Sequence, residues 1–210
     1  MGPACAAALT AAERAIALDP RLAQGYYNRA SSLSLLNNYK AALGAYDQAI
    51  ACQPMYAEAL TGKGLALAHL GKAHDGVVAC ERATQVDAGS ALVWRGLAIT
   101  LTLANRGGEA IPAINRAVEL DSDDSTNWVI KTVILAELFR YSDALIAVSH
   151  ALELEPANQE VLSLKAQLEQ AQSAGLMRTA RGTGRGFAGG LFRTVGAVAS
   201  EFGKAVFKDL

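Results

Sequence analysis

The chain has 210 residues, of which 51% are hydrophobic and 19% are charged, and its formal net charge at pH 7 is −1. This composition is apolar enough to bury a continuous core, and the near-zero charge points to no particular class of partner. Its three widely spaced cysteines exclude a disulfide framework and a zinc site, and no stretch is long and apolar enough to span a bilayer.

Small residues recur at a spacing of 34 residues along most of the chain. One column is alanine throughout: Ala15, Ala49, Ala83, Ala117 and Ala151. Where two helices cross closely, only Ala or Gly lets the backbones approach, and large side chains of the neighbour fill the space around them. The spacing therefore predicts an all-α solenoid of antiparallel helix pairs.

The chain divides into an array over residues 1–172 and a C-terminal extension. The array is predicted to contain, in chain order, a half repeat over residues 4–20, helix pairs over 23–54, 57–88, 91–122 and 125–156, and a capping helix over 157–172. The half repeat either caps the array or marks the chain as a fragment. Pro112 predicts a kink or a late helix start, because proline lacks an amide hydrogen. Cys52 and Cys80 fall on core columns and are predicted to be buried.

The extension changes in composition. Residues 173–190 are rich in Gly and Arg and predict a flexible linker. Within residues 191–210, apolar side chains recur at helical spacing and predict an amphipathic docking helix: Leu191, Phe192, Val195, Val198, Phe202 and Val206. From residue 172 onward there are six basic and two acidic residues, a net charge of +4, so the preceding residues carry −5 of the total of −1. Opposite charges favour contact within the chain or between copies, and a solubilising tail is the alternative.

The repeated columns resemble those of tetratricopeptide repeat proteins. The fullest match is the run Tyr26-Tyr27-Asn28-Arg29-Ala30, followed by Leu33, Tyr39, Ala42, Tyr46, Ala49 and Pro54. The resemblance covers about residues 5 to 172 and implies a right-handed superhelical solenoid whose first helices line a concave groove. The pattern departs from the family at Cys80 and Gly107, where aromatic residues are usual.

The resemblance also implies which residues line the groove. They are Gln24, Tyr27, Asn28, Ser31, Glu58, Leu65, Leu92, Arg95, Ile99, Val129 and Val133. No Lys, Arg or Asn stands at the positions where chaperone-binding members clamp a C-terminal carboxylate, which argues against such ligands. The groove is apolar in its central and C-terminal repeats, with Arg95 as its one cation, and suits an amphipathic helix or an extended apolar peptide. The alternative is that these residues are core.

These features predict a non-catalytic, cytoplasmic scaffold or adaptor that binds another protein or peptide. His69, His74 and His150 lie far apart and have no partners at metal-ligand or catalytic spacing, so we expect no enzyme activity, metal or cofactor. The Gly/Arg-rich segment has one aromatic residue for base stacking, so no specific nucleic acid is expected. The alternative is a self-associating or membrane-peripheral adaptor, whose C-terminal helix docks in its own groove or makes weak contact with lipid.

Overall fold

The computed structural model describes residues 2–181 of the chain. These residues form ten α-helices and no strand: α1 (Gly2–Leu18), α2 (Ala23–Leu35), α3 (Tyr39–Cys52), α4 (Ala57–His69), α5 (Ala73–Val86), α6 (Ala91–Leu103), α7 (Gly107–Leu120), α8 (Ser125–Glu137), α9 (Tyr141–Leu154) and α10 (Gln159–Arg181). The predicted docking helix and the second half of the predicted linker lie outside the described residues.

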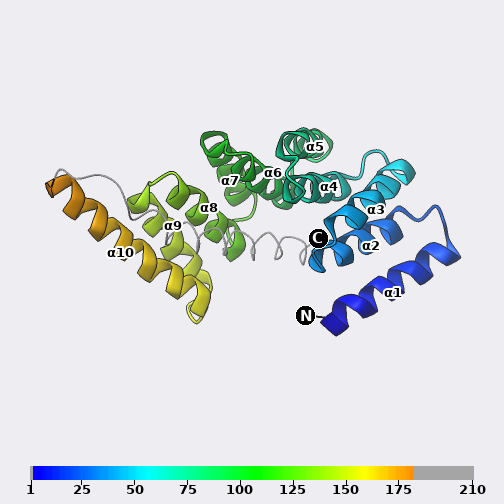
Figure 1. Cartoon of the computed structure of the whole chain (residues 1–210), viewed down its shortest axis with the longest axis horizontal. Coiled ribbons are helices and arrows are strands. Elements are labelled where there is room, and N and C mark those ends of the chain that lie inside the picture. The colour runs from blue at the N-terminus through cyan, green and yellow to red at the C-terminus, as the bar shows by residue number, and fades with distance from the viewer. Residues whose placement is uncertain (1, 182–210) are drawn as a thin grey trace.

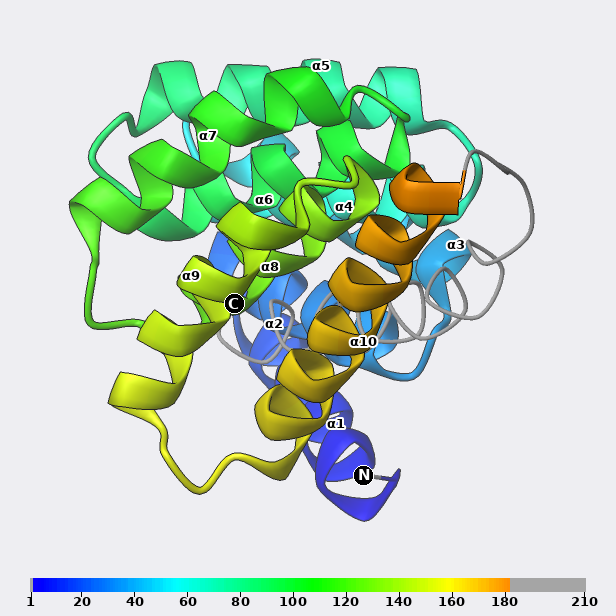
Figure 2. The same ribbon diagram turned by 90° about the vertical axis from the view of Figure 1, so that its left-hand side faces the viewer.

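The helices stack as pairs into a curved array that runs from α1 at one end to α10 at the other (Figure 1). Each helix packs against the next, and α4 also packs directly against α6. In Figure 2, α5 and α7 lie along one side of α4, α6 and α8. The first helices of the pairs therefore form an inner layer and the second helices an outer layer, as expected for a helical solenoid.

Glycines allow close approaches between neighbouring helices, both across the two layers and within the inner layer. A Cβ atom at Gly64 of α4 would lie 2.4 Å from Cys80 Sγ and 2.7 Å from the carbonyl oxygen of Gly76, both on α5. A Cβ atom at Gly96 of α6 would lie 2.2 Å from Thr61 Cγ2 on α4. Since real Cβ atoms do not approach other atoms so closely, these helices can pack in this way only if glycine occupies both positions.

Each first helix ends in the same left-handed turn. The turn residues follow the 34-residue spacing and have positive φ angles: Asn37 (59°), Gly71 (78°), Asn105 (58°) and Phe139 (60°). In each turn the next amide donates to the carbonyl five residues earlier, as from Asn38 to Leu33 at 2.8 Å. This pattern satisfies the free carbonyl groups at the end of the helix and reverses the chain into the second helix.

Side-chain hydrogen bonds to backbone carbonyl groups stabilise the turns between repeats. Three aromatic donors bond to the carbonyl six residues upstream: Tyr26 Oη to Pro20 (3.2 Å), Trp94 Nε1 to Ala88 (2.9 Å) and Trp128 Nε1 to Ser122 (2.8 Å). Leu60 occupies the equivalent position in the second pair and has no donor. There Arg82 Nη2 donates to the carbonyl of Pro54 at 3.2 Å, so the same backbone group is satisfied from a different helix.

The structure excludes a late helix start at Pro112 and the burial of Cys52. No late helix start occurs near Pro112, because α7 begins at Gly107 and continues through Pro112. The missing amide leaves the carbonyl of Gly108 without its helical donor, but Gly108 is exposed and water can hydrate it. Cys80 is fully buried as predicted, whereas Cys52 is exposed. Cys52 is the last residue of a second helix, a position that is also exposed at Leu18.

The described helices also extend beyond the predicted boundaries. Helix α1 begins at Gly2 rather than residue 4, and α10 reaches Arg181 instead of ending at Gln172. The first part of the predicted linker is thus helical, because Ala, Leu and Met favour a helix more than the single Gly175 opposes it. No helix within residues 2–181 combines the length and the apolar character needed to cross a membrane.

Candidate functional site

The residues predicted to line the groove lie on the inner layer. Helix α2 carries Gln24, Tyr27, Asn28 and Ser31, α4 carries Glu58 and Leu65, α6 carries Leu92, Arg95 and Ile99, and α8 carries Val129 and Val133. Gln24 and Asn28 are exposed, Glu58 and Leu92 are half-buried, and the others are buried. The structure gathers five of these eleven residues into two places, one beside α2 and one between α6 and α8.

The first place is an aromatic cluster on and beside α2. The ring of Tyr27 lies 6.2 Å from that of Tyr46 and 5.1 Å from that of Tyr56, measured between centroids. Tyr56 Oη donates to Gln24 Oε1 at 2.6 Å, and Gln24 Nε2 donates to Asn28 Oδ1 at 2.8 Å. Burial raises the pKa of Tyr56 to about 12, so the hydroxyl stays protonated and remains a donor at neutral pH.

The second place is a pocket of about 60 Å³ between α6 and α8. Its lining residues are Ile99, Thr102, Leu103, Ile130, Val133, Ile134 and Glu137. Two of them, Ile99 and Val133, were predicted from the sequence. Five of the seven are aliphatic, and the hydroxyl of Thr102 donates to Ala98 of its own helix at 2.8 Å. A pocket with such walls takes an apolar group in preference to water.

Glu137 is the one charged residue of this pocket, and the sequence analysis did not predict it. It is the last residue of α8, and burial raises the pKa of its carboxyl group. Among the described residues it forms no ion pair. A cation placed here would compensate a partly desolvated carboxylate and would face the negative end of the helix dipole.

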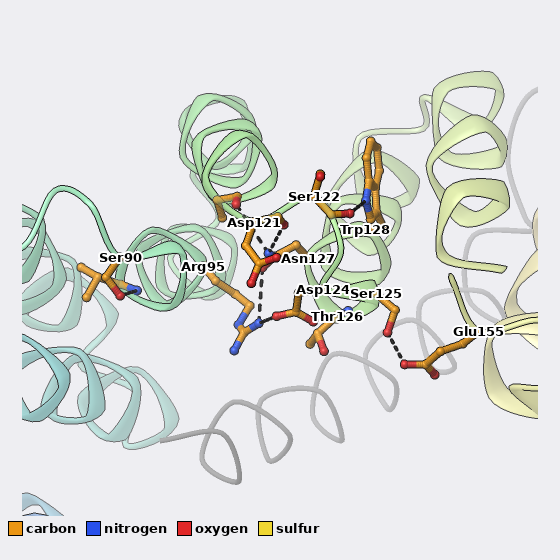
Figure 3. Close-up of polar contacts among 12 residues, drawn as sticks. Ser90, Arg95, Asp121, Ser122, Asp124, Ser125, Thr126, Asn127, Trp128 and Glu155 are labelled. Carbon is orange, nitrogen blue, oxygen red and sulfur yellow. Dashed lines mark hydrogen bonds and ion pairs between the residues drawn. The ribbon is translucent and has the colours of Figure 1, made fainter. Parts of the chain in front are cut away.

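Arg95 links its own helix pair to the next one through polar contacts. Its guanidinium group is buried, pairs with Asp124 at the start of α8, and donates to Asn127 Oδ1 at 3.3 Å (Figure 3). Asn127 Nδ2 in turn donates to the carbonyl of Asp121 at 3.0 Å, and Asp124 Oδ1 accepts from the amide of Thr126 at 2.8 Å. The cation predicted for the groove is therefore neutralised by the next repeat.

A second hollow lies on the outer side, between α3 and α5 over α4, and is more polar. Its charged lining includes Lys63, which pairs with Asp47 at 2.7 Å, and Arg82, which is bonded to Pro54. Lys63 and Arg82 therefore already have partners within the chain, and we base the functional proposal on the pocket between α6 and α8. In the described part of the chain, no group of three His, Cys, Asp or Glu residues could hold a metal ion.

A curved stack of antiparallel helix pairs is the architecture of an α-helical solenoid. Residues 23–54 match the family model of the tetratricopeptide repeat. The described residues thus form an all-α solenoid, which confirms the fold class predicted from the sequence, and the match over residues 23–54 agrees with the predicted resemblance to tetratricopeptide repeat proteins.

Solved structures agree with this fold. TTC0263, a thermophilic tetratricopeptide repeat protein of Thermus thermophilus, aligns with a TM-score of 0.68 and 21% identity over 80% of this chain and 90% of its own. YrrB, a tetratricopeptide repeat protein with an unusual peptide-binding site, aligns with a TM-score of 0.56 and 20% identity over 95% and 98%. A MamA fragment of Desulfovibrio magneticus RS-1 aligns with a TM-score of 0.60 and 16% identity over 75% and 89%. Comparison with curated protein sequences gave no match.

Proposed function

We propose that the protein is a non-catalytic scaffold or adaptor that binds an apolar segment of another protein on its inner layer. The observation that carries this proposal is the apolar pocket between α6 and α8, which includes Ile99 and Val133 from the predicted groove. The peptide-binding site of YrrB, which has a similar fold, adds support. The cysteines of the chain are free, which suits a reducing compartment and supports a cytoplasmic location.

The chemistry of the pocket defines the kind of ligand. A pocket of about 60 Å³ holds part of one side chain, so the rest of the ligand has to lie along α6 and α8. The carboxylate of Glu137 favours a basic residue beside the apolar anchor. An amphipathic helix meets both conditions, because residues three or four apart share a face while basic residues flank it.

The test is binding of a fluorescein-labelled peptide of 18 residues, designed from Leu, Lys and Ala with one apolar helical face. Thr102→Phe fills the pocket and is expected to weaken binding at least about tenfold, the factor for 1.4 kcal/mol. Thr84→Phe on α5 is the matched control, since each of these hydroxyls only donates to its own helix, to Ala98 and Glu81. Fluorescence anisotropy gives the dissociation constants, and circular dichroism checks that both variants are folded.

Equal weakening by the two substitutions would place the peptide elsewhere and refute the proposed site. Glu137→Gln adds a second criterion that does not depend on pocket volume. It is expected to weaken binding of the lysine-containing peptide and to leave unchanged the binding of a peptide in which glutamine replaces the lysines.

A further inference from the structure

We propose that the pocket between α6 and α8 binds residues 191–208 of this same chain. This inference rests on the proposed function, because it concerns the occupant of the same surface when no partner is present. Residues 191–208 lie outside the described residues, so the argument depends on their sequence and on the groups that the described residues present.

The apolar character of the pocket matches that of the segment. Of the described residues that line it, five are aliphatic and two, Thr102 and Glu137, are polar. Val195, Val198 and Phe202 recur three and four residues apart in the segment, a spacing that places them on one face of a helix. One of these side chains can enter the pocket while its neighbours along the helix cover the surfaces of α6 and α8.

The charges are complementary. Glu137 lacks a cation among the described residues and lies at the C-terminal end of α8. The segment carries Arg193, Lys204 and Lys208 outside its apolar face. Residues 182–210 have four basic and two acidic residues, a net charge of +2, so the rest of the chain carries −3 of the total of −1. A basic segment opposite an acidic array is favoured by the long-range field as well as by the pocket.

Nine residues, 182–190, separate the end of α10 at Arg181 from the segment. Residues 182–190 can span up to about 30 Å when extended. Residues 191–208 in a helical conformation would be about 27 Å long, enough to lie along the inner layer. Binding within one chain has an effective concentration in the millimolar range, so a weak contact is sufficient.

The experiment is amide hydrogen exchange on the full chain and on two variants. Val198→Asp with Phe202→Asp places charge on the apolar face, and Ala197→Asp with Ser200→Asp adds the same charge on the opposite face. We expect the amides of α6 and α8 around Ile99 and Val133 to exchange about tenfold faster in the first variant, as when a ligand present at ten times its dissociation constant is removed. The control is expected to match the wild type.

Exchange that is the same in the wild type and the first variant would overturn the proposal. A difference that depends on protein concentration would assign the segment to a second copy, and a difference that requires anionic lipid vesicles would assign it to a membrane surface. Each of these outcomes contradicts docking within the chain.

Anisotropy with the designed peptide separates this inference from the proposed function. The first variant is expected to bind the peptide about tenfold more tightly than the wild type, because the competing segment is released. Equal binding to both proteins overturns docking and leaves the proposed function standing, provided that Thr102→Phe still weakens binding. Absence of binding to either protein refutes the proposed function, and docking then has no partner to regulate.

Discussion

At Gly64, α4 approaches α5 so closely that there is no room for a side chain larger than the hydrogen atom of glycine. Its absent Cβ would meet Cys80 Sγ and the backbone of Gly76, neither of which is the free end of a flexible side chain. Gly64→Ala is therefore expected to lower the free energy of unfolding by about 1–3 kcal/mol through overpacking. Denaturant unfolding followed by circular dichroism measures the change.

Gly44 in the middle of α3 is the matched control, because nothing lies within 4 Å of a Cβ built there. Gly44→Ala is expected to raise the free energy of unfolding by about 0.5–1 kcal/mol, since alanine is the better helix former. A loss of stability at both positions would show that the effect at Gly64 does not arise from the close approach of α4 and α5.

Phe139 occupies a backbone conformation that suits asparagine or glycine. Its φ angle is 60°, the residue is 58% exposed, and its ring makes an edge contact with that of Tyr141 at 6.2 Å between centroids. A left-handed residue with a bulky side chain costs about 1–2 kcal/mol. Phe139→Asn is thus expected to stabilise the protein by about 1 kcal/mol, and Asn105→Phe to destabilise it by a similar amount. Two changes of the same sign in thermal unfolding would contradict this account.

Glu137 makes stability depend on pH in a defined direction. Burial raises its pKa in the folded state above the ordinary value near 4.3, so folding favours the protonated carboxyl group. This contribution to stability is fully present below the unfolded pKa and is lost as the pH rises through the folded pKa. In the Val198→Asp and Phe202→Asp background, where the docking of residues 191–208 is disrupted, Glu137→Gln is therefore expected to be more stable than its parent at pH 7 and equally stable below about pH 4.

Urea titrations of both proteins at the two pH values measure this difference. A glutamine variant that is less stable at pH 7 would mean that the carboxylate has a stabilising partner in the folded chain.

At the scale of one helix, α7 is shaped by an internal proline. Pro112 stands six residues into the helix, where it removes the donor to Gly108 and keeps a proline ring inside the helix. Pro112→Ala is expected to raise the free energy of unfolding by up to about 3 kcal/mol, less the entropy that proline removes from the unfolded chain. Pro54→Ala in the turn before α4 is the control and is expected to have a smaller effect. Chemical denaturation compares the two, and an unchanged midpoint for Pro112→Ala would show that α7 has already adapted to the ring.

The helix pairs could be predicted from the sequence because small residues at the helix crossings recur every 34 residues. The exposed position of Cys52 was not predictable, since it is the last residue of a second helix, and burial varies along that column from exposed at Leu18 to partly buried at Val86. The left-handed turn at Phe139 could not be predicted from the residue type. Its counterparts Asn105 and Gly71 are residues that favour a positive φ angle, whereas phenylalanine does not.

The candidate site could be predicted only in part, because some of its residues come together only through packing between helices. Ile99 and Val133 stand at positions that the family uses in its groove, whereas Glu137 lies one turn further along α8 and joins the pocket only through the packing of α6 on α8. The pairing of Arg95 with Asp124 links residues of two repeats, a contact that no short sequence pattern encodes.

Among the residues that the structure describes, buried side chains form two large clusters and a smaller one around Leu60 and Val93 rather than one uniform core. One extends mainly over α2 to α7 and the other over α8 to α10, and Ile111 of α7 packs against both. In a solenoid each repeat contacts only its neighbours, so stability is close to a sum of local terms. The array is therefore expected to open from its C-terminal end without losing the rest.

Leu164→Ala and Leu65→Ala test this expectation with the same chemical change in the two clusters. Leu164 of α10 is 1% exposed and Leu65 of α4 is 0% exposed, so each substitution removes fully buried methyl groups at a cost of about 2–5 kcal/mol. Native-state hydrogen exchange should then show faster exchange in α9 and α10 of Leu164→Ala and wild-type protection in α3 to α5. Leu65→Ala should speed exchange across α3 to α7, because a break in the middle of a stack uncouples repeats on both sides. Uniform loss of protection in both variants would mean that the clusters unfold as one cooperative unit.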